Sequence, residues 1–260
     1  MTAAITLGSV VHDAAFGNVV ATETLHAPGL RLPTHDHEPV NLTIVLEGGF
    51  EEHVGCEAIA CAPGTALLKP QGAHHSNAYG AAPVHCLTLA FHDVEASAVN
   101  VARHPSFQVD AYRLRYELLR RDPGFEFAAE SLAFALLGDV TRVRVETRRP
   151  CWIDAVEERL RDEERISVAA LARAVGRHPS HMAREFRRHA GCTLGEYRRE
   201  VRFARVCAAL RSERPLIDVA LDAGFSDQAH FTNAFRRRFG VTPKQFRAQD
   251  SFKTRARRRR

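Results

Sequence analysis

Histidines gather in the first part of the chain at spacings that suit a metal or ligand site. Ten of the 14 histidines lie within residues 1–150. His35 and His37 are two positions apart, so the alternation of a strand places both side chains on one face. Together with His75 they make three imidazoles, a set that can hold zinc or another divalent ion in tetrahedral geometry. Because the sequence GAHH does not fix its own register, His74 is the alternative to His75.

Three uses of these histidines stay open. They hold a divalent metal, they line a metal-free pocket for a small molecule, or they form a purely structural cluster. The sequence favours the metal-free pocket. His85 raises the same question, because it shares a strand face with Leu87, Leu89 and Phe91. It lines the pocket if that face points into the interior, although a core histidine with one hydrogen bond is the favoured interpretation.

The segment 15–93 supplies the strands that must position these side chains. Short β-type runs alternate with Gly/Pro turns, as in NLTIVLEGGF, GTALLKPQGAHH and PVHCLTLAFH. That rhythm is typical of a small antiparallel β-barrel. A barrel turns one face of each strand toward a shared interior, where a ligand could bind.

Two segments of this barrel resemble the paired motifs of the cupin superfamily. The first is GLRLPTHDHEPVNLTIVLEG at 29–48, and the second is GTALLKPQGAHHSN at 64–77. For metal-binding cupins the resemblance places the ligands at four positions: His35, His37, a glutamate near position 41, and His75. This chain has Asn41 there instead, and a neutral amide is a weak ligand. The resemblance thus implies zinc or a similar divalent metal without fixing it as a cofactor.

The second half of the chain contains an internal repeat. VAALARAVG at 168–176 matches LIDVALDAG at 216–224, and FRRHAGCTLGEYR at 186–198 matches FRRRFGVTPKQFR at 235–247, with one residue added in the turn. Each copy is predicted to be a short helix, a glycine turn and a second helix. Between the copies, 193–211 is predicted to be one helix with apolar stripes on two sides, which suits a helix wedged between two subdomains.

The second helix of each copy is predicted to turn a polar, basic face outward. Ser167 is a plausible N-cap for the first helix of the first copy, and Asp227 is one for the second helix of the second copy. The expected outward residues are Ser180, His181, Arg184, Arg187 and Arg188 in the first copy and Gln228, His230, Asn233, Arg236 and Arg237 in the second. Such side chains reach base edges and phosphates in DNA. A solvated basic face explains one such helix equally well, but two copies in the same frame favour DNA binding.

The stretch DVALDAGFSDQAHFTNAFRRRFGVTP at 218–243 resembles the signature of the AraC/XylS family of transcription regulators. The resemblance covers about 150–250 and implies two helix-turn-helix units joined by a long helix. Family base-contacting positions fall on Ser180, Ala183, Arg184, Gln228, Ala229, His230 and Asn233. The small side chains among them suit close approach or a thymine methyl rather than base hydrogen bonds.

Charge divides the chain in the same way. Residues 1–150 hold 11 Lys+Arg and 17 Asp+Glu, a net charge of −6, whereas 151–260 hold 25 and 14, a net charge of +11. Only the second half is therefore expected to meet a polyanion. The chain has no apolar run of the length that a membrane span needs, and its start does not resemble a secretion signal, so the cytoplasm is the expected location.

The predicted fold class is α+β, with four segments. They are a cupin-like ligand-sensing barrel at 1–95, a helical linker or dimerisation segment at 96–150, an all-α double helix-turn-helix domain at 151–250, and a basic disordered tail at 251–260. The six cysteines form no CxxC pair and are expected to be reduced thiols. A basic tail of this kind would add non-specific attraction to phosphates.

These observations predict a sequence-specific DNA-binding transcription regulator, and not an enzyme, controlled by a small effector in the barrel. The expected partners are double-stranded DNA, the small molecule, a second copy of the chain and RNA polymerase. One alternative is a metal-responsive regulator that uses His35, His37 and His75. Another is a metal-dependent cupin enzyme, which the absence of a glutamate at position 41 argues against.

Overall fold

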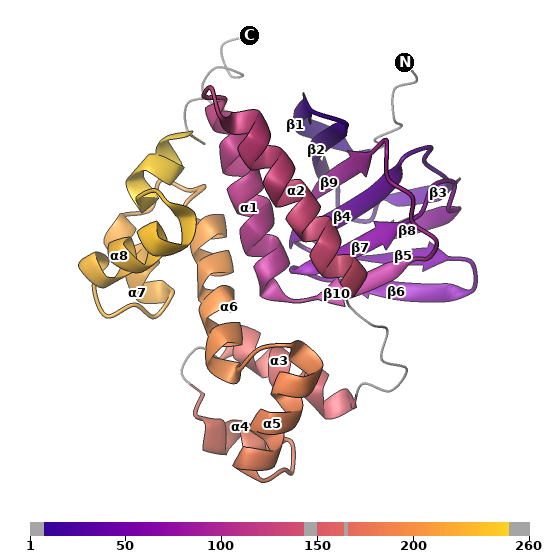
Figure 1. Ribbon diagram of the computed structural model, residues 1–260. Coiled ribbons are helices and arrows are strands. Elements are labelled where there is room, and N and C mark those ends of the chain that lie inside the picture. The colour runs from indigo at the N-terminus through magenta and orange to yellow at the C-terminus, as the bar shows by residue number, and fades with distance from the viewer. Residues whose placement is uncertain (1–7, 143–149, 164–165, 250–260) are drawn as a thin grey trace. The chain divides into compact units, whose positions relative to one another are not determined.

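The computed structural model describes residues 8–142, 150–163 and 166–249, and the chain divides into two compact units, Met1–Val145 and Glu146–Arg260. Figure 1 labels the helices and strands of each unit. The predicted tail at 251–260 lies outside the described residues.

The first unit is built on ten strands that form two antiparallel sheets. A six-stranded sheet has the order β1-β2-β9-β4-β7-β10, and a four-stranded sheet has the order β3-β8-β5-β6. The strands are β1 (Ser9–Phe16), β2 (Val19–His26), β3 (Arg31–His35), β4 (Val40–Glu47), β5 (Phe50–Val54), β6 (Glu57–Cys61), β7 (Thr65–Lys69), β8 (His75–Tyr79), β9 (Val84–Phe91) and β10 (Asn100–Arg103).

The two sheets enclose one interior. Its apolar part contains Val45, Leu67 and Cys86 of the larger sheet together with Phe50 and Tyr79 of the smaller sheet. Because side chains alternate along a strand, the residues two positions from these also face inward. The predicted barrel is therefore present, and its strands run from residue 9 to residue 103, beyond the predicted 15–93.

Helices α1 (Pro105–Arg120) and α2 (Phe125–Arg142) pack on the outer face of the larger sheet, as Figure 1 shows. The predicted division into a barrel at 1–95 and a linker at 96–150 is therefore not how the chain folds. Strand β10 pairs with β7, and both helices bury their apolar faces on the sheet, because the larger sheet is apolar on both faces and needs a cover.

A buried group of charges joins α1 to this outer face. Glu23 of β2 accepts a hydrogen bond from His85 Nε2 at 2.7 Å and a second from Arg115 Nε of α1 at 2.8 Å. All three residues are buried. His85 therefore does not line the barrel interior, which corrects one of the predicted ligand-pocket residues. It lies one residue from Cys86, which faces inward, so alternation turns His85 toward the helices.

The second unit consists of helices and carries the repeat seen in the sequence. Its helices are α3 (Cys151–Asp162), α4 (Val168–Ala174), α5 (Pro179–Ala190), α6 (Leu194–Ala209), α7 (Leu216–Asp222) and α8 (Gln228–Phe239). The predicted caps are confirmed, because Ser167 Oγ accepts from Ala170 N at 3.1 Å and Asp227 Oδ1 accepts from His230 N at 2.7 Å. Among the described residues, none of the helices is long and apolar enough to cross a membrane.

Helix α6 contributes to two separate cores. Tyr197 is fully buried and packs edge-on against Phe186 of α5, with 5.5 Å between the ring centroids. Further along α6, Phe203 contacts the rings of Phe235 and Phe239 of α8. The predicted helix with two apolar stripes is thus confirmed. Its 16 residues span about 24 Å.

The charge cluster on the outer face of the barrel makes stability depend on pH. Burial raises the pKa of Glu23, but the hydrogen bond from His85 and the charge of Arg115 outweigh it and lower the pKa from 4.5 to about 2. The ionised Glu23 therefore stabilises the fold fully above pH 4.5, and this contribution is lost as the pH falls toward 2.

We expect Glu23→Gln to lower the free energy of unfolding by about 3–5 kcal/mol at pH 7, because Arg115 would keep a buried charge without its partner. Urea unfolding at several pH values measures this, with Glu51→Gln at an exposed carboxylate as the control. The difference in the free energy of unfolding between wild type and Glu23→Gln should become smaller as the pH falls from 4.5 toward 2. A difference that does not change with pH would contradict the stabilising role of ionised Glu23.

Candidate functional site

The structure brings His35, His37 and His75 together in the first unit. One ring nitrogen of each lies within 4.8 Å of the others. The ring centroids of His35 and His75 are 4.2 Å apart, and the His37 centroid lies 5.1 Å from each of these two. His74, the alternative in the sequence, is instead exposed, with its Nδ1 3.4 Å from Asp36.

Backbone contacts fix which nitrogen His35 and His75 offer. His35 Nδ1 donates to Pro33 O at 2.9 Å, and His75 Nδ1 donates to Ala73 O at 2.8 Å. A carbonyl oxygen only accepts, so each neutral ring carries its proton on Nδ1 and its lone pair on Nε2. Metal-bound histidines are held in the same way by a hydrogen bond from the nitrogen that does not bind the metal.

Burial and a nearby cation keep two of these rings neutral. Burial, together with the positive charge of Lys69, lowers the pKa of His37 to about 4 and the pKa of His75 to about 4. Both imidazoles are therefore uncharged at pH 7. Neutral imidazole is the form that binds a metal or accepts a hydrogen bond from a ligand.

A buried ion pair lies against this cluster. Glu52 of β5 is fully buried and accepts from Lys69 Nζ at 2.9 Å and from Asn77 Nδ2 at 2.7 Å. Its Oε1 also lies 3.6 Å from His75 Nε2. Neither Glu52 nor Lys69 was predicted from the sequence, although a charged residue within an apolar strand such as TALLK was an available signal.

Asn41 lies on the inward face of β4. It shares this face with Thr43 and Val45, and it pairs across the strands with Lys69. Its Nδ2 donates to Pro39 O at 3.1 Å. Of the five predicted barrel residues, the structure therefore places His35, His37, Asn41 and His75 in the interior, and His85 outside it.

The histidine cluster fits a divalent cation. His75 Nε2 is buried, carries a lone pair and has no hydrogen-bond partner among the described residues. A buried acceptor without a partner costs free energy, which a bound cation would relieve. Neutral imidazoles are ligands of zinc, copper, nickel and iron, so the donor set suits a first-row transition metal.

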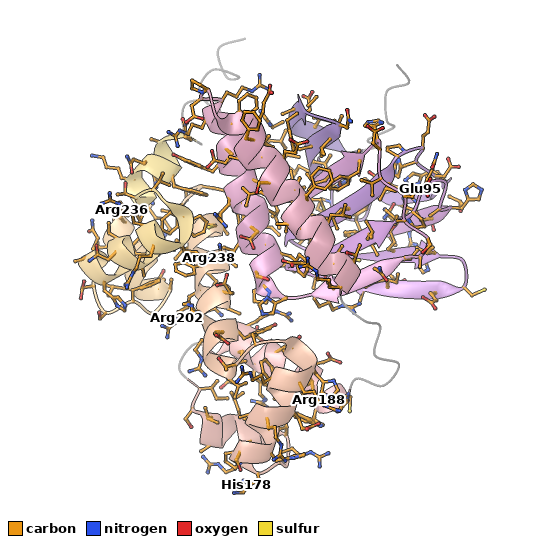
Figure 2. All side chains as sticks on the ribbon, viewed as in Figure 1. Glu95, His178, Arg188, Arg202, Arg236 and Arg238 are labelled. Carbon is orange, nitrogen blue, oxygen red and sulfur yellow. The ribbon has the colours of Figure 1, made fainter. Side chains whose placement is uncertain are left out.

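In the second unit, α5 and α8 present the predicted polar side chains to solvent. Of the twelve residues predicted to face DNA, eleven are exposed and Ala183 is half-buried, whereas Met182 and Phe186 of α5 and Phe231 and Phe235 of α8 are buried. Figure 2 shows His178 and Arg188 extending from the first helix-turn-helix unit and Arg236 from the second.

Local hydrogen bonds orient several of these side chains. Arg184 lies 3.4 Å from His181 Nδ1 on α5. On α8, His230 Nδ1 is 3.1 Å from Ser226 Oγ, and Arg237 Nε donates to Asn233 O at 3.3 Å. The exposed ends of both helices therefore carry donors and acceptors of the kind that bind base edges and phosphates.

A groove between α6 and α8 adds arginines that the sequence analysis missed. Arg198, Arg199 and Arg202 of α6 line it together with Arg237 and Arg238 of α8. Arg202 is labelled in Figure 2. The run YRREVR at 197–202 was the available signal, but these arginines share α6 with the apolar stripes that predict its buried faces. Such a concentration of guanidinium groups suits a phosphate backbone.

Comparison with known proteins decides the family. A family described as a helix-turn-helix domain matches residues 171–249. The probable transcription factor PqrA of Proteus vulgaris is 38% identical over 93 residues, which are 35% of this chain and 76% of that protein. The chain belongs to the AraC/XylS family of transcription regulators. The regulatory protein SoxS of Escherichia coli K12 is 34% identical over 97 residues, which are 37% of this AraC/XylS member and 86% of SoxS.

Two solved structures are also similar. ToxT from Vibrio cholerae has a TM-score of 0.38 and 8% identity, over 90% of this AraC/XylS member and 99% of that chain. KdgF from Halomonas sp. has a TM-score of 0.29 and 21% identity, over 30% of this chain and 73% of that chain. At such low scores, the family assignment depends on the sequence relatives.

We expect Arg184→Ala and Asn233→Ala each to weaken specific DNA binding by about 1–3 kcal/mol and to relax the preference at one base pair, while the fold stays intact. Fluorescence anisotropy on a duplex selected from a random pool measures this. Arg159→Ala on α3, outside both helix-turn-helix units, is the matched control. If wild type and both variants bind the selected duplex with equal affinity, Arg184 and Asn233 do not contact bases.

Proposed function

We propose that this transcription regulator changes its affinity for specific double-stranded DNA when a small effector binds inside the barrel. The effector occupies the polar end of the interior, beside His35, His37 and His75. The barrel then acts as a sensor and not as an enzyme, and the relatives named as regulators support the DNA-binding half of this proposal. The proposed location is the cytoplasm, where the target DNA of such a regulator lies.

The polar interior of the barrel is the observation that carries this proposal. A barrel with a purely structural role is filled with apolar side chains, because burying polar groups costs free energy. This barrel instead buries Glu52, Lys69, His75 and Asn77 beside an apolar cluster. Ligand pockets combine an apolar lining with a few convergent polar groups, which is the arrangement here.

A divalent metal is the second candidate for the effector. The unpartnered Nε2 of His75 and the backbone hydrogen bonds that orient His35 and His75 favour it. In that case the ion itself is the signal, and the three histidines hold it. A bound metal would supply a fixed positive charge and would link His37 to the paired strands β3 and β8 at one end of the barrel.

We also propose that the regulator acts as a homodimer and contacts RNA polymerase. Phe127 of α2 is 80% exposed, and Phe134, seven residues later on the same helix face, is 45% exposed. Exposed aromatic side chains in a row are typical of protein interfaces. The two exposed phenylalanines support the dimer only. The proposed contact with RNA polymerase rests on the role of a transcription regulator.

A ligand screen tests the regulated function. We expect at least one small molecule to raise the melting temperature of the full chain and, at the same concentration, to change the affinity for its selected DNA severalfold. The substitution Asn77→Leu, in the polar interior, should remove both effects, whereas Ser76→Ala, on the next residue of β8, should keep them. Ligands that stabilise the protein while DNA affinity stays constant would contradict regulation through the barrel.

Elemental analysis of untagged protein tests the metal. We expect a stoichiometric divalent metal in wild type, its loss in the double variant His35→Ala/His37→Ala, and its retention in His74→Ala, because His74 is exposed and outside the cluster. Removal of the metal by a chelator should then change DNA affinity in wild type and in His74→Ala, and leave the DNA affinity of the double variant unchanged. Protein without metal before and after incubation with zinc would exclude the metal-responsive form of the proposal.

A further inference from the structure

The histidine cluster lacks an acidic residue at the position where the resemblance to cupins expects one. Asn41 carries no charge, and its amide nitrogen is already engaged with Pro39 O. A carboxylate nevertheless reaches the cluster from another strand, because Glu52 of β5 lies opposite Asn77 of β8, two residues from His75. The Oε1 atom of Glu52 is 3.6 Å from His75 Nε2.

The contact between Glu52 and His75 is unfavourable as it stands. His75 donates from Nδ1 to Ala73 O, so its Nε2 carries a lone pair. Two electron-rich atoms then face each other at 3.6 Å in a buried site, although Lys69 Nζ donates to the same Oε1. A cation bound to both would turn this repulsion into attraction.

The separation of the two atoms suits a shared cation. Ligands at about 2.0–2.1 Å from a tetrahedral zinc are about 3.3 Å from one another. The 3.6 Å between Glu52 Oε1 and His75 Nε2 is close to that value. By contrast, the nitrogens of the three histidines lie within 4.8 Å, so the rings would move closer on binding.

We propose that Glu52 is the acidic ligand of a cation held by His35, His37 and His75, and that Lys69 is the counter-ion of Glu52 before the cation arrives. The Lys69 Nζ lies 2.9 Å from the same Oε1 atom that faces His75, so the ammonium group and a cation on this oxygen would repel each other at close range. This inference rests on the metal-responsive form of the proposed function.

Charge then determines how tightly the cation binds. The cation brings two positive charges, of which Glu52 balances one, and Lys69 keeps a further positive charge nearby. Like charges in a buried site repel strongly, so Lys69 weakens binding. Loading would displace the ammonium group from Oε1, while Asn77 would keep its hydrogen bond to Oε2.

Metal titration of the full chain tests this arrangement. The metal-free protein is titrated with Zn²⁺ against a chromophoric chelator, and with Co²⁺ while the visible absorption reports the coordination. We expect Glu52→Gln to weaken zinc binding at least tenfold and to change the cobalt spectrum. Lys69→Met should tighten binding by a similar factor. Glu51→Gln, on the neighbouring exposed residue, should stay within about twofold of wild type.

The double variant Glu52→Gln/Lys69→Met controls for misfolding of the single variants. It removes both buried charges together, so neither charge is left in the interior without its partner. It should bind zinc at least tenfold more weakly than Lys69→Met. Equal affinity of these two variants, with zinc still lost in His35→Ala/His37→Ala, would overturn the role of Glu52 and leave the metal site standing. Weaker zinc binding by Lys69→Met than by wild type would overturn the claim that Lys69 opposes the cation. A wild type that binds no zinc would overturn this inference and the metal-responsive function together.

Discussion

The alternation of side chains across the six-stranded sheet is the constraint on which the first unit depends. The sheet is covered on both faces, by the smaller sheet on one side and by α1 and α2 on the other. Each strand therefore sends one set of residues to the barrel interior and the next set to the helices. The chain buries charges on both faces, Glu52 with Lys69 inside and Glu23 with Arg115 outside. Of two neighbouring residues on one strand, one thus faces the barrel interior and the other packs against the helices.

This two-sided burial explains which predictions succeeded. His35, His37 and His75 could be grouped from the sequence because Gly and Pro turns delimit their motifs. His85 could not be assigned to a face, because β9 is apolar at nearly every position and shows no alternation. Glu52 was missed for a related reason. Its partner Lys69 lies on another strand, and single-sequence reasoning does not reveal pairing across a sheet.

The helical unit was easier to predict because its contacts are local. A repeated pattern of caps, glycine turns and aromatic anchors identified the helices, and Phe186 and Phe235 occupy the same place in each copy. The arginine groove between α6 and α8 escaped notice, since it forms from residues of two helices that only the fold brings together. Local periodicity thus defines helices well, but surfaces shared between helices need the three-dimensional structure.

Helix α6 belongs to the cores of both helix-turn-helix units, through Tyr197 at one end and Phe203 at the other. The two reading helices are therefore joined by a continuous helix and not by a flexible tether. For such a protein we expect a target site of two short sequence boxes at one fixed separation, of the order of a turn of DNA. An insertion of half a turn between the boxes would place the second box on the opposite side of the duplex. A genome search for sites of this regulator can therefore hold the spacer length constant.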